Sequence, residues 1–142
     1  MQFNPSKCNI ICISNKQRPP QRSYFFCRSK LEQVDSASYV GITVNSKLKW
    51  SEHISSISSK ASRSFGLIKR NIWNCPRKVR ETAYTSIVRP KLEYTSASWD
   101  PHHKKDVSTL ERVQRKATRF CLQNFNKTAS VADMLSELNG IH

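Results

Sequence analysis

The chain has 142 residues, about the length of one domain, and hydrophobic residues make up 37% of it. It carries 24 Lys and Arg against 10 Asp and Glu, a net charge of +14. This balance favours polyanionic partners, with nucleic acid first and anionic membrane second. No run of about 18 apolar residues is present, which excludes a membrane-spanning helix, and we expect no membrane partner.

The first third of the chain has the pattern of short strands. Apolar or β-branched runs occur at 8–14 (CNIICIS), 24–27 (YFFC) and 39–44 (YVGITV). Asp35, Ser36 and Ser38 are residues typical of a turn between the last two runs. The pattern predicts a small antiparallel sheet.

After Trp50 the apolar period becomes helical. A stripe at three- and four-residue steps predicts a first helix with these buried positions: Ile54, Ile57, Ala61, Phe65, Ile68 and Ile72. A second helix begins near Pro76, carries the apolar residues Val79, Ala83, Ile87 and Val88, and stops at Arg89-Pro90.

Three more helical pieces follow. A short piece covers 91–99, a long helix covers 104–124, and Ser130 with Asp133 approximates a capping box for a last helix. The predicted class is α+β, a small antiparallel sheet over 1–48 followed by a helical bundle over 49–142.

The five cysteines (8, 12, 27, 75 and 121) are odd in number and irregularly spaced. They predict reduced thiols and an intracellular location. No Cys or His spacing typical of a zinc module is present, so we predict no metal site.

Two basic helix faces are candidate phosphate-binding surfaces. In the long helix, one stripe at about 100° per residue contains Lys105, Arg112, Arg115, Lys116 and Arg119. In the first helix, Lys60, Arg63 and Arg70 lie away from the apolar stripe, among small Ser and Gly residues that permit close approach of a backbone. The alternative for both faces is a solvated surface that serves solubility.

Several motifs occur in a fixed order: YVGI at 39–42, WSEHI at 50–54, NCP at 74–76, VRPKLEY at 88–94 and SASWDPH at 96–102. In this order they resemble the segment that follows the polymerase core in reverse transcriptases of jockey-like non-LTR retrotransposons. The resemblance covers nearly the whole chain, and it implies that the helical part is the thumb, which clamps the template–primer duplex.

The resemblance also implies roles for particular residues. Asn4-Pro-Ser-Lys7 matches an Asn-x-x-Lys element whose lysine lies near the incoming triphosphate. Tyr39, Val40 and Gly41 match the primer grip, a tight hairpin that holds the primer 3′ end. A glycine suits that place because a backbone that approaches a nucleic-acid strand leaves no room for a side chain.

The catalytic machinery of that family is not recognisable in this sequence. Nucleotidyl transfer uses two Mg²⁺ ions held by clustered carboxylates, and no two of the ten acidic residues here are adjacent. We therefore expect a polymerase fragment with no activity alone and no cofactor, since Mg²⁺ belongs to the full-length family enzyme.

Three hypotheses follow. The first is a fragment that binds RNA–DNA template–primer without sequence preference, in the nucleus or the cytoplasm. The second is a helical interaction module that docks on the remainder of a reverse transcriptase or on another protein. The third is a non-functional relic with an orphaned edge strand.

Overall fold

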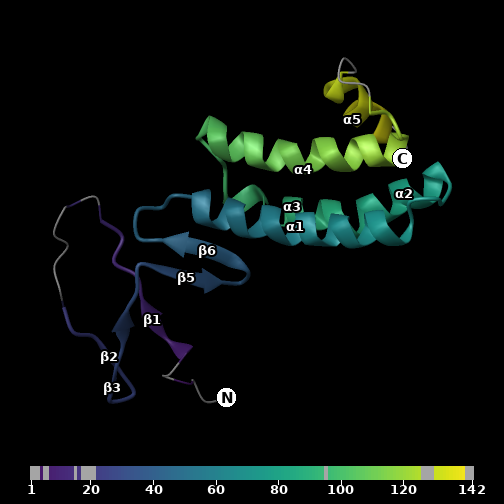
Figure 1. Ribbon diagram of the computed structural model, residues 1–142. Helices are drawn as coiled ribbons and strands as arrows, with labels where there is room; N and C mark the ends of the chain where they lie inside the picture. The colour runs from purple at the N-terminus through teal and green to yellow at the C-terminus, as the bar shows by residue number, and fades with distance from the viewer. Residues whose placement is uncertain are drawn as a thin grey trace. The chain divides into compact units, whose positions relative to one another are not determined.

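The computed structural model (Figure 1) describes residues 4, 7–14, 16, 22–94, 96–125 and 130–139. It has the expected α+β composition, with short strands first and helices after them. Backbone packing divides the chain into two compact units, Met1–His53 and Ile54–His142. The division falls within the first turn of the first helix, a little later than the expected 48/49 boundary.

Within the described residues of the first unit, the strands form three separate two-stranded pairs. β1 (Asn9–Ile10) pairs in parallel with β4 (Glu32–Gln33). β2 (Phe25–Phe26) pairs antiparallel with β3 (Ser29–Lys30), and β5 (Ser36–Tyr39) pairs antiparallel with β6 (Ile42–Asn45). The predicted α+β class with small antiparallel sheets is confirmed by β2–β3 and β5–β6, while the β1–β4 pair is parallel and the pairs do not join into one sheet.

Two tight turns explain the difference. Cys27 and Arg28 have φ of 48° and 64°, and Val40 and Gly41 have φ of 48° and 80°. Two successive left-handed residues form the type I′ turn that closes a two-residue hairpin. Run 39–44, predicted as one strand, therefore folds back on itself, and run 24–27 ends in the turn that joins β2 to β3. Ser36 and Ser38, predicted as turn residues, lie in β5.

α1 (Ser51–Asn71) confirms the predicted first helix. Ile54, Ile57, Ala61 and Ile68 are buried, and Phe65 and Ile72 pack partly buried against the core. Because these positions recur at helical spacing, one side of α1 is continuously apolar.

The second helix does not stop at Arg89-Pro90, which corrects the prediction. α2 (Arg77–Ala83) continues through a π-helical segment (Tyr84–Val88) into α3 (Arg89–Glu93). The Arg89 N–H bonds to the Tyr84 carbonyl, five residues back. Proline lacks an N–H and crowds the carbonyl four residues before it, and the wider π turn accommodates both effects.

The buried side of this second helix differs from what its apolar residues indicate. Arg80, Tyr84, Val88 and Leu92 are buried, while Val79 and Ile87 are 45% and 44% exposed. A sequence pattern assigns apolar residues to the core, so it selects Val79 over Arg80. Arg80 is buried instead because backbone carbonyls accept its hydrogen bonds.

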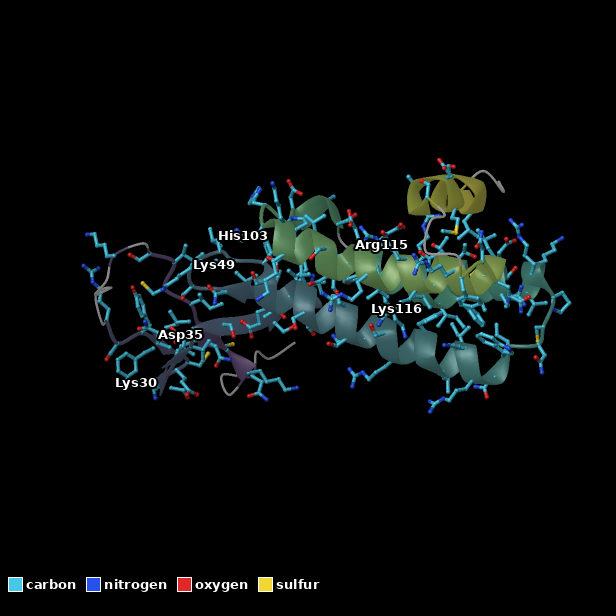
Figure 2. All side chains as sticks on the ribbon, turned by 45° about the horizontal axis from the view of Figure 1, so that its top comes forward. Lys30, Asp35, Lys49, His103, Arg115 and Lys116 are labelled. Carbon is cyan, nitrogen blue, oxygen red and sulfur yellow. The ribbon has the colours of Figure 1, made fainter. Side chains whose placement is uncertain are left out.

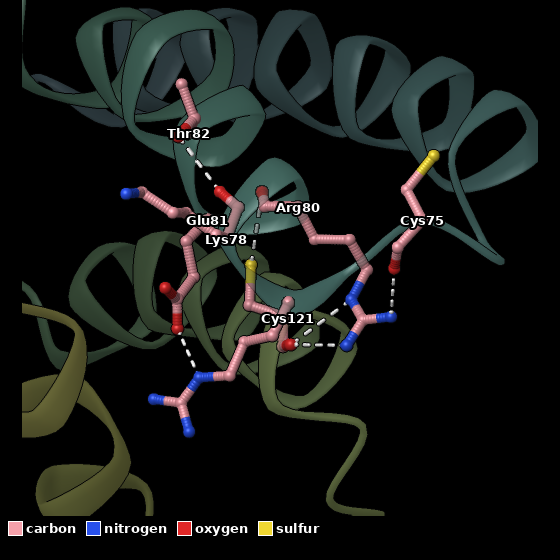
Figure 3. A network of polar contacts seen from close by, with 7 residues as sticks. Cys75, Lys78, Arg80, Glu81, Thr82 and Cys121 are labelled. Atoms are coloured by element: carbon pink, nitrogen blue, oxygen red, sulfur yellow. Dashed lines mark hydrogen bonds and ion pairs between the residues drawn. The ribbon is translucent and has the colours of Figure 1, made fainter.

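Figure 3 shows the hydrogen bonds of Arg80. Its Nε and Nη2 donate to the Cys121 carbonyl at 3.2 and 3.0 Å, and its Nη1 donates to the Cys75 carbonyl at 2.8 Å. Cys121 lies in the last turn of a helix, where carbonyls lack intrahelical partners. The guanidinium also lies 5.8 Å from the Phe120 ring centroid. Arg80 thus joins the segment after α1 to the end of α4.

α4 (Lys104–Leu122) confirms the predicted long helix, and Gln123 ends it with a left-handed φ of 50°. A 3₁₀ turn (Ser96–Ser98) precedes it, so the helical piece predicted over 91–99 is present in part, as the end of α3 and this turn. α5 (Val131–Asn139) begins at Ser130, whose hydroxyl accepts a hydrogen bond from the Asp133 N–H, as the capping box predicts.

The core of the second unit is formed by α1, the α2–α3 helix, α4 and α5. Its buried cluster consists of Ala61, Ile68, Tyr84, Val88, Leu92, Val113, Ala117, Phe120, Cys121 and Leu138. α1 and α4 run alongside each other (Figure 1), and Phe65 meets Phe120 edge to face at 5.7 Å. No helix in the described part of the chain is long and apolar enough to cross a membrane.

Candidate nucleic-acid interface

The three primer-grip candidates lie at the tip of the β5–β6 hairpin. Tyr39 ends β5, and Val40 and Gly41 form the turn. Tyr39 is 75% exposed and Val40 is 64% exposed. The hairpin therefore presents an aromatic and an aliphatic side chain to solvent at the end of a narrow backbone turn.

Val40 adopts a backbone conformation that β-branched residues rarely tolerate. Its φ of 48° places it in the left-handed region, where a type I′ turn usually has Asn, Asp or Gly. Such strain costs about 1–2 kcal/mol and is typical of functional sites. Gly41, with φ of 80°, has no side chain to strain.

The start of α1 holds this hairpin in place. The Thr43 N–H of β6 donates to Nδ1 of the buried His53 at 3.2 Å. The Ser36 hydroxyl of β5 donates to the Glu52 carboxylate at 3.1 Å. Both strands are thus hydrogen-bonded to the first turn of one helix, which makes the hairpin tip a supported structure.

Lys7 lies in a local turn of the N-terminal segment. Its backbone N–H donates to the Asn4 carbonyl at 3.1 Å, and its side chain is exposed. No group of three His, Cys, Asp or Glu residues that could hold a metal ion occurs among the residues that the structure describes.

The candidate phosphate-binding residues of α1 are solvent-exposed. Lys60, Arg63 and Arg70 are all exposed, and helical geometry places Arg63 and Arg70 opposite the buried isoleucines. They form no ion pair within the described part of the chain. This outer face of α1 is the first of two basic surfaces.

The candidates of α4 divide between two environments. Lys105, Arg112, Arg115 and Lys116 are exposed, and Arg119 is half-buried. The Arg115 guanidinium bonds to the Glu111 carboxylate at 2.6 Å, so Arg115 is already paired. Lys116 lies on the side of α4 that faces α1 (Figure 2), and it contributes with Arg119 to a groove.

This feature, the α1–α4 groove, has a volume of about 440 Å³. Its lining consists of Ser62, Phe65, Lys69, Val113, Lys116, Arg119, Phe120 and Phe125. Three cations from two helices therefore surround a floor with three aromatic rings, and no acidic residue lines it among those described. Lys69 was not among the predicted residues, since its role depends on the approach of α4.

Among the described residues, one buried polar atom of the groove has no hydrogen-bond partner. Nε of Arg119 is buried, and it has no hydrogen-bond acceptor within the described part of the chain. An unsatisfied buried donor costs about 1–3 kcal/mol. Arg119 is thus a cation with an unused N–H beside a solvent-accessible groove.

An aromatic stack borders one end of the groove. The ring of Trp73 stacks on that of Phe125 at 6.0 Å between centroids, and it also contacts Phe120 at 5.7 Å. Lys69 Nζ lies 5.4 Å from the Trp73 ring. Trp73 is 39% exposed and Phe125 is 53% exposed.

Cysteine chemistry does not contribute to this interface. All five cysteines are free. Cys121 is fully buried, and this burial raises the pKa of its thiol to about 12. A thiol of that kind stays protonated and unreactive near neutral pH.

The comparisons with known proteins give one relative. No protein-family model and no solved structure matches the chain. Among curated proteins, the chain is similar to "Probable RNA-directed DNA polymerase from transposon X-element" of Drosophila melanogaster, with 25% identity over 123 residues. The aligned part covers 83% of this chain and 13% of the fly protein. The chain is therefore distantly related to a transposon RNA-directed DNA polymerase and spans a small part of its relative's length.

Proposed function

We propose that the chain is the primer-grip and thumb portion of a jockey-like non-LTR retrotransposon reverse transcriptase. In this proposal it binds RNA–DNA template–primer through phosphates, without sequence preference, inside the cell in the nucleus or cytoplasm. The distant similarity to a transposon RNA-directed DNA polymerase supports the origin. The ordered motifs from YVGI to SASWDPH support the position within the polymerase.

The observation that carries this proposal is the arrangement of cations on α1 and α4. Seven of the eight candidates are exposed, and the eighth, Arg119, borders the groove. Among the eight, only Arg115 pairs with a carboxylate within the described part of the chain. Exposed cations without internal partners are available to phosphates, and each phosphate contact releases counterions.

The hairpin tip adds a second contact in this proposal. Tyr39, Val40 and Gly41 would meet the primer end, because the tip is exposed, narrow and held by His53 and Glu52. The strained Val40 supports a functional tip, since a stability-driven turn would have Asn there.

The test is fluorescence anisotropy of the chain with an RNA–DNA primer–template across a salt series. Affinity should fall steeply with salt and be equal for unrelated sequences of the same length. The double substitution Lys105→Gln with Arg112→Gln should reduce the logarithmic salt slope by about two, one per lost phosphate contact. Lys47→Gln with Lys49→Gln, two exposed lysines of the first unit, is the matched control.

Either of two results would contradict the proposal. One is an affinity that does not change with salt. The other is an equal decrease of the salt slope in the α4 variant and in the control variant, which would show that only the net charge matters and not the position of the cations. The pair Arg63→Gln and Arg70→Gln tests the outer face of α1 in the same way.

We further propose that this chain has no polymerase activity alone. Its ten acidic residues include no adjacent pair, and two-metal nucleotidyl transfer needs clustered carboxylates. The purified chain with Mg²⁺, primer–template and deoxynucleotides should leave the primer unextended. Template-dependent extension would contradict the proposal.

The exposed Val79 and Ile87 favour a second candidate function, docking on a polymerase core supplied in trans. A contiguous exposed apolar patch often marks a protein contact. In that case Val79→Ser with Ile87→Ser should abolish capture of such a core while nucleic-acid affinity is unchanged. Capture that is equal in wild type and variant would exclude this surface.

A further inference from the structure

The α1–α4 groove combines two features that the outer basic faces do not share. Its rim carries Lys69, Lys116 and Arg119, and its floor is aromatic and aliphatic. A surface that only holds the outside of a duplex needs cations and no apolar floor, because the bases of a duplex are stacked inside it. The floor therefore fits a ligand with both an anionic and an apolar aromatic part.

We propose that the α1–α4 groove binds one unpaired nucleotide of a single strand or of a template overhang. The base stacks on the Phe125 ring, and its phosphates contact Lys69, Lys116 and Arg119. This inference rests on the proposed nucleic-acid binding and deepens it, since it assigns a single-stranded ligand to one place on the second unit.

The aromatic geometry supports the base contact. Phe125 lines the groove, is 53% exposed, and is backed by Trp73 at 6.0 Å with the two ring planes 21° apart. A base on Phe125 extends an existing near-parallel stack. Stacking on aromatic side chains accepts every base, so this contact keeps the binding independent of sequence.

The charges support the phosphate contact. Three cations converge from α1 and α4 with no acidic residue in the lining among those described. Nε of Arg119 is buried and has no acceptor among the residues that the structure describes. A small rotation of its guanidinium toward the groove gives this N–H a phosphate oxygen, and planar guanidinium groups bind phosphates in a forked geometry.

The size of the groove limits the ligand. A volume of about 440 Å³ is within the range of sites for single small ligands, about 300–1,000 Å³. It suits one nucleotide unit and excludes a base-paired helix. The duplex and the unpaired nucleotide thus contact different parts of the second unit.

The experiment compares three fluorescent ligands with equal numbers of phosphates: a short single strand, the same strand with abasic sites, and a blunt duplex. The wild-type chain should bind the base-bearing strand about ten-fold more tightly than the abasic strand. Phe125→Ala should remove this preference and leave the affinities for the abasic strand and the blunt duplex unchanged.

Phe25→Ala is the matched control, because Phe25 is a 66% exposed phenylalanine of the first unit. It should retain the full base preference. Lys116→Gln should weaken binding of the base-bearing and abasic strands by equal factors. Circular dichroism verifies that each variant is folded, and Phe125 is exposed enough for its truncation to be tolerated.

The outcomes separate this inference from the proposed function. No base preference in the wild type, or a preference that survives Phe125→Ala, overturns the groove assignment while duplex binding stands. Failure to bind any of the three ligands overturns the nucleic-acid function itself. An acidic apolar peptide serves as a competitor in a last test. If it binds tightly and displaces the single strand equally well from the wild type and from Phe125→Ala, the strand does not depend on Phe125, which counts against the groove.

Discussion

At the scale of single residues, Arg80 is the clearest case of a side chain placed against its usual preference. Its guanidinium is buried and is satisfied by carbonyls from two segments that are distant in sequence. Arg80→Met should lower the free energy of unfolding by about 2–3 kcal/mol, because it leaves buried carbonyls without donors. Urea denaturation followed by circular dichroism measures the change.

Arg77→Met is the control for this prediction. Arg77 lies in the same helix, is exposed, and pairs with Glu81 four residues on. Its loss should cost about 0.5 kcal/mol or less, as for surface ion pairs in general. Equal costs at the two positions would show that burial of Arg80 contributes nothing.

Val40 leads to a prediction of the opposite sign. Val40→Asn should stabilise the chain by about 1 kcal/mol, because asparagine tolerates the left-handed conformation that the turn requires. Val44→Asn, in the extended part of the same hairpin, should destabilise it. If the tip holds a primer end, Val40→Asn should also weaken primer–template binding, which would show that the strain serves function.

The Cys121 thiol gives the chain a pH dependence. Burial raises its pKa from 9.0 to about 12 in the folded chain. The unfolded chain therefore loses this proton first, and the stabilisation present below pH 9 is lost as pH rises toward the folded pKa. The loss is about 1.4 kcal/mol per pH unit. Cys121→Ala should show a shallower alkaline decline, and an unchanged slope would contradict the assignment.

At the scale of the elements, the α1–α4 groove has a cost in stability. Lys69, Lys116 and Arg119 converge without a carboxylate in the described lining, so they repel one another. Lys116→Gln should raise the melting temperature slightly at low salt, by an amount that disappears when salt screens the charges. Arg63→Gln, on the outer face of α1, should have no such effect. A lower melting temperature for Lys116→Gln would contradict this repulsion.

The elements also show what the sequence could predict and what it could not. α1 and α4 were predictable because their apolar residues recur at helical spacing over five turns. The π-helical segment was not, because its register depends on how Pro90 is accommodated. The residue pattern alone indicated a strand at Val40-Gly41, because Val40 is a strong strand former at a turn position, whereas the resemblance implied the tight hairpin that is found there.

The candidate site shows the same division. The cations of α4 were recognisable because one helix places them on one side. The groove was not, because Lys69 and Phe125 come from segments that meet only after α1 and α4 pack. Arg80 carries no signal in a single sequence that distinguishes it from the other basic residues of its helix.

At the scale of the whole molecule, a net charge of +14 opposes compaction and favours contact with polyanions. Moderate salt should therefore raise the melting temperature of the free chain while it lowers the affinity for nucleic acid. Melting curves over a salt series measure the first effect. A melting temperature that falls with salt would show that attractive ion pairs outweigh the repulsion.

The position of Arg80 has a consequence for motion. It fastens the backbone after α1 to the last turn of α4, at the end where Trp73 and Phe125 border the groove. The two helices are therefore held together at their C-terminal ends, and separation should begin at their N-terminal ends. Amide hydrogens near Leu110, in the N-terminal half of α4, should then exchange faster than those near Phe120. A strand that enters the groove would do so from the looser end and stop at the stacked rings.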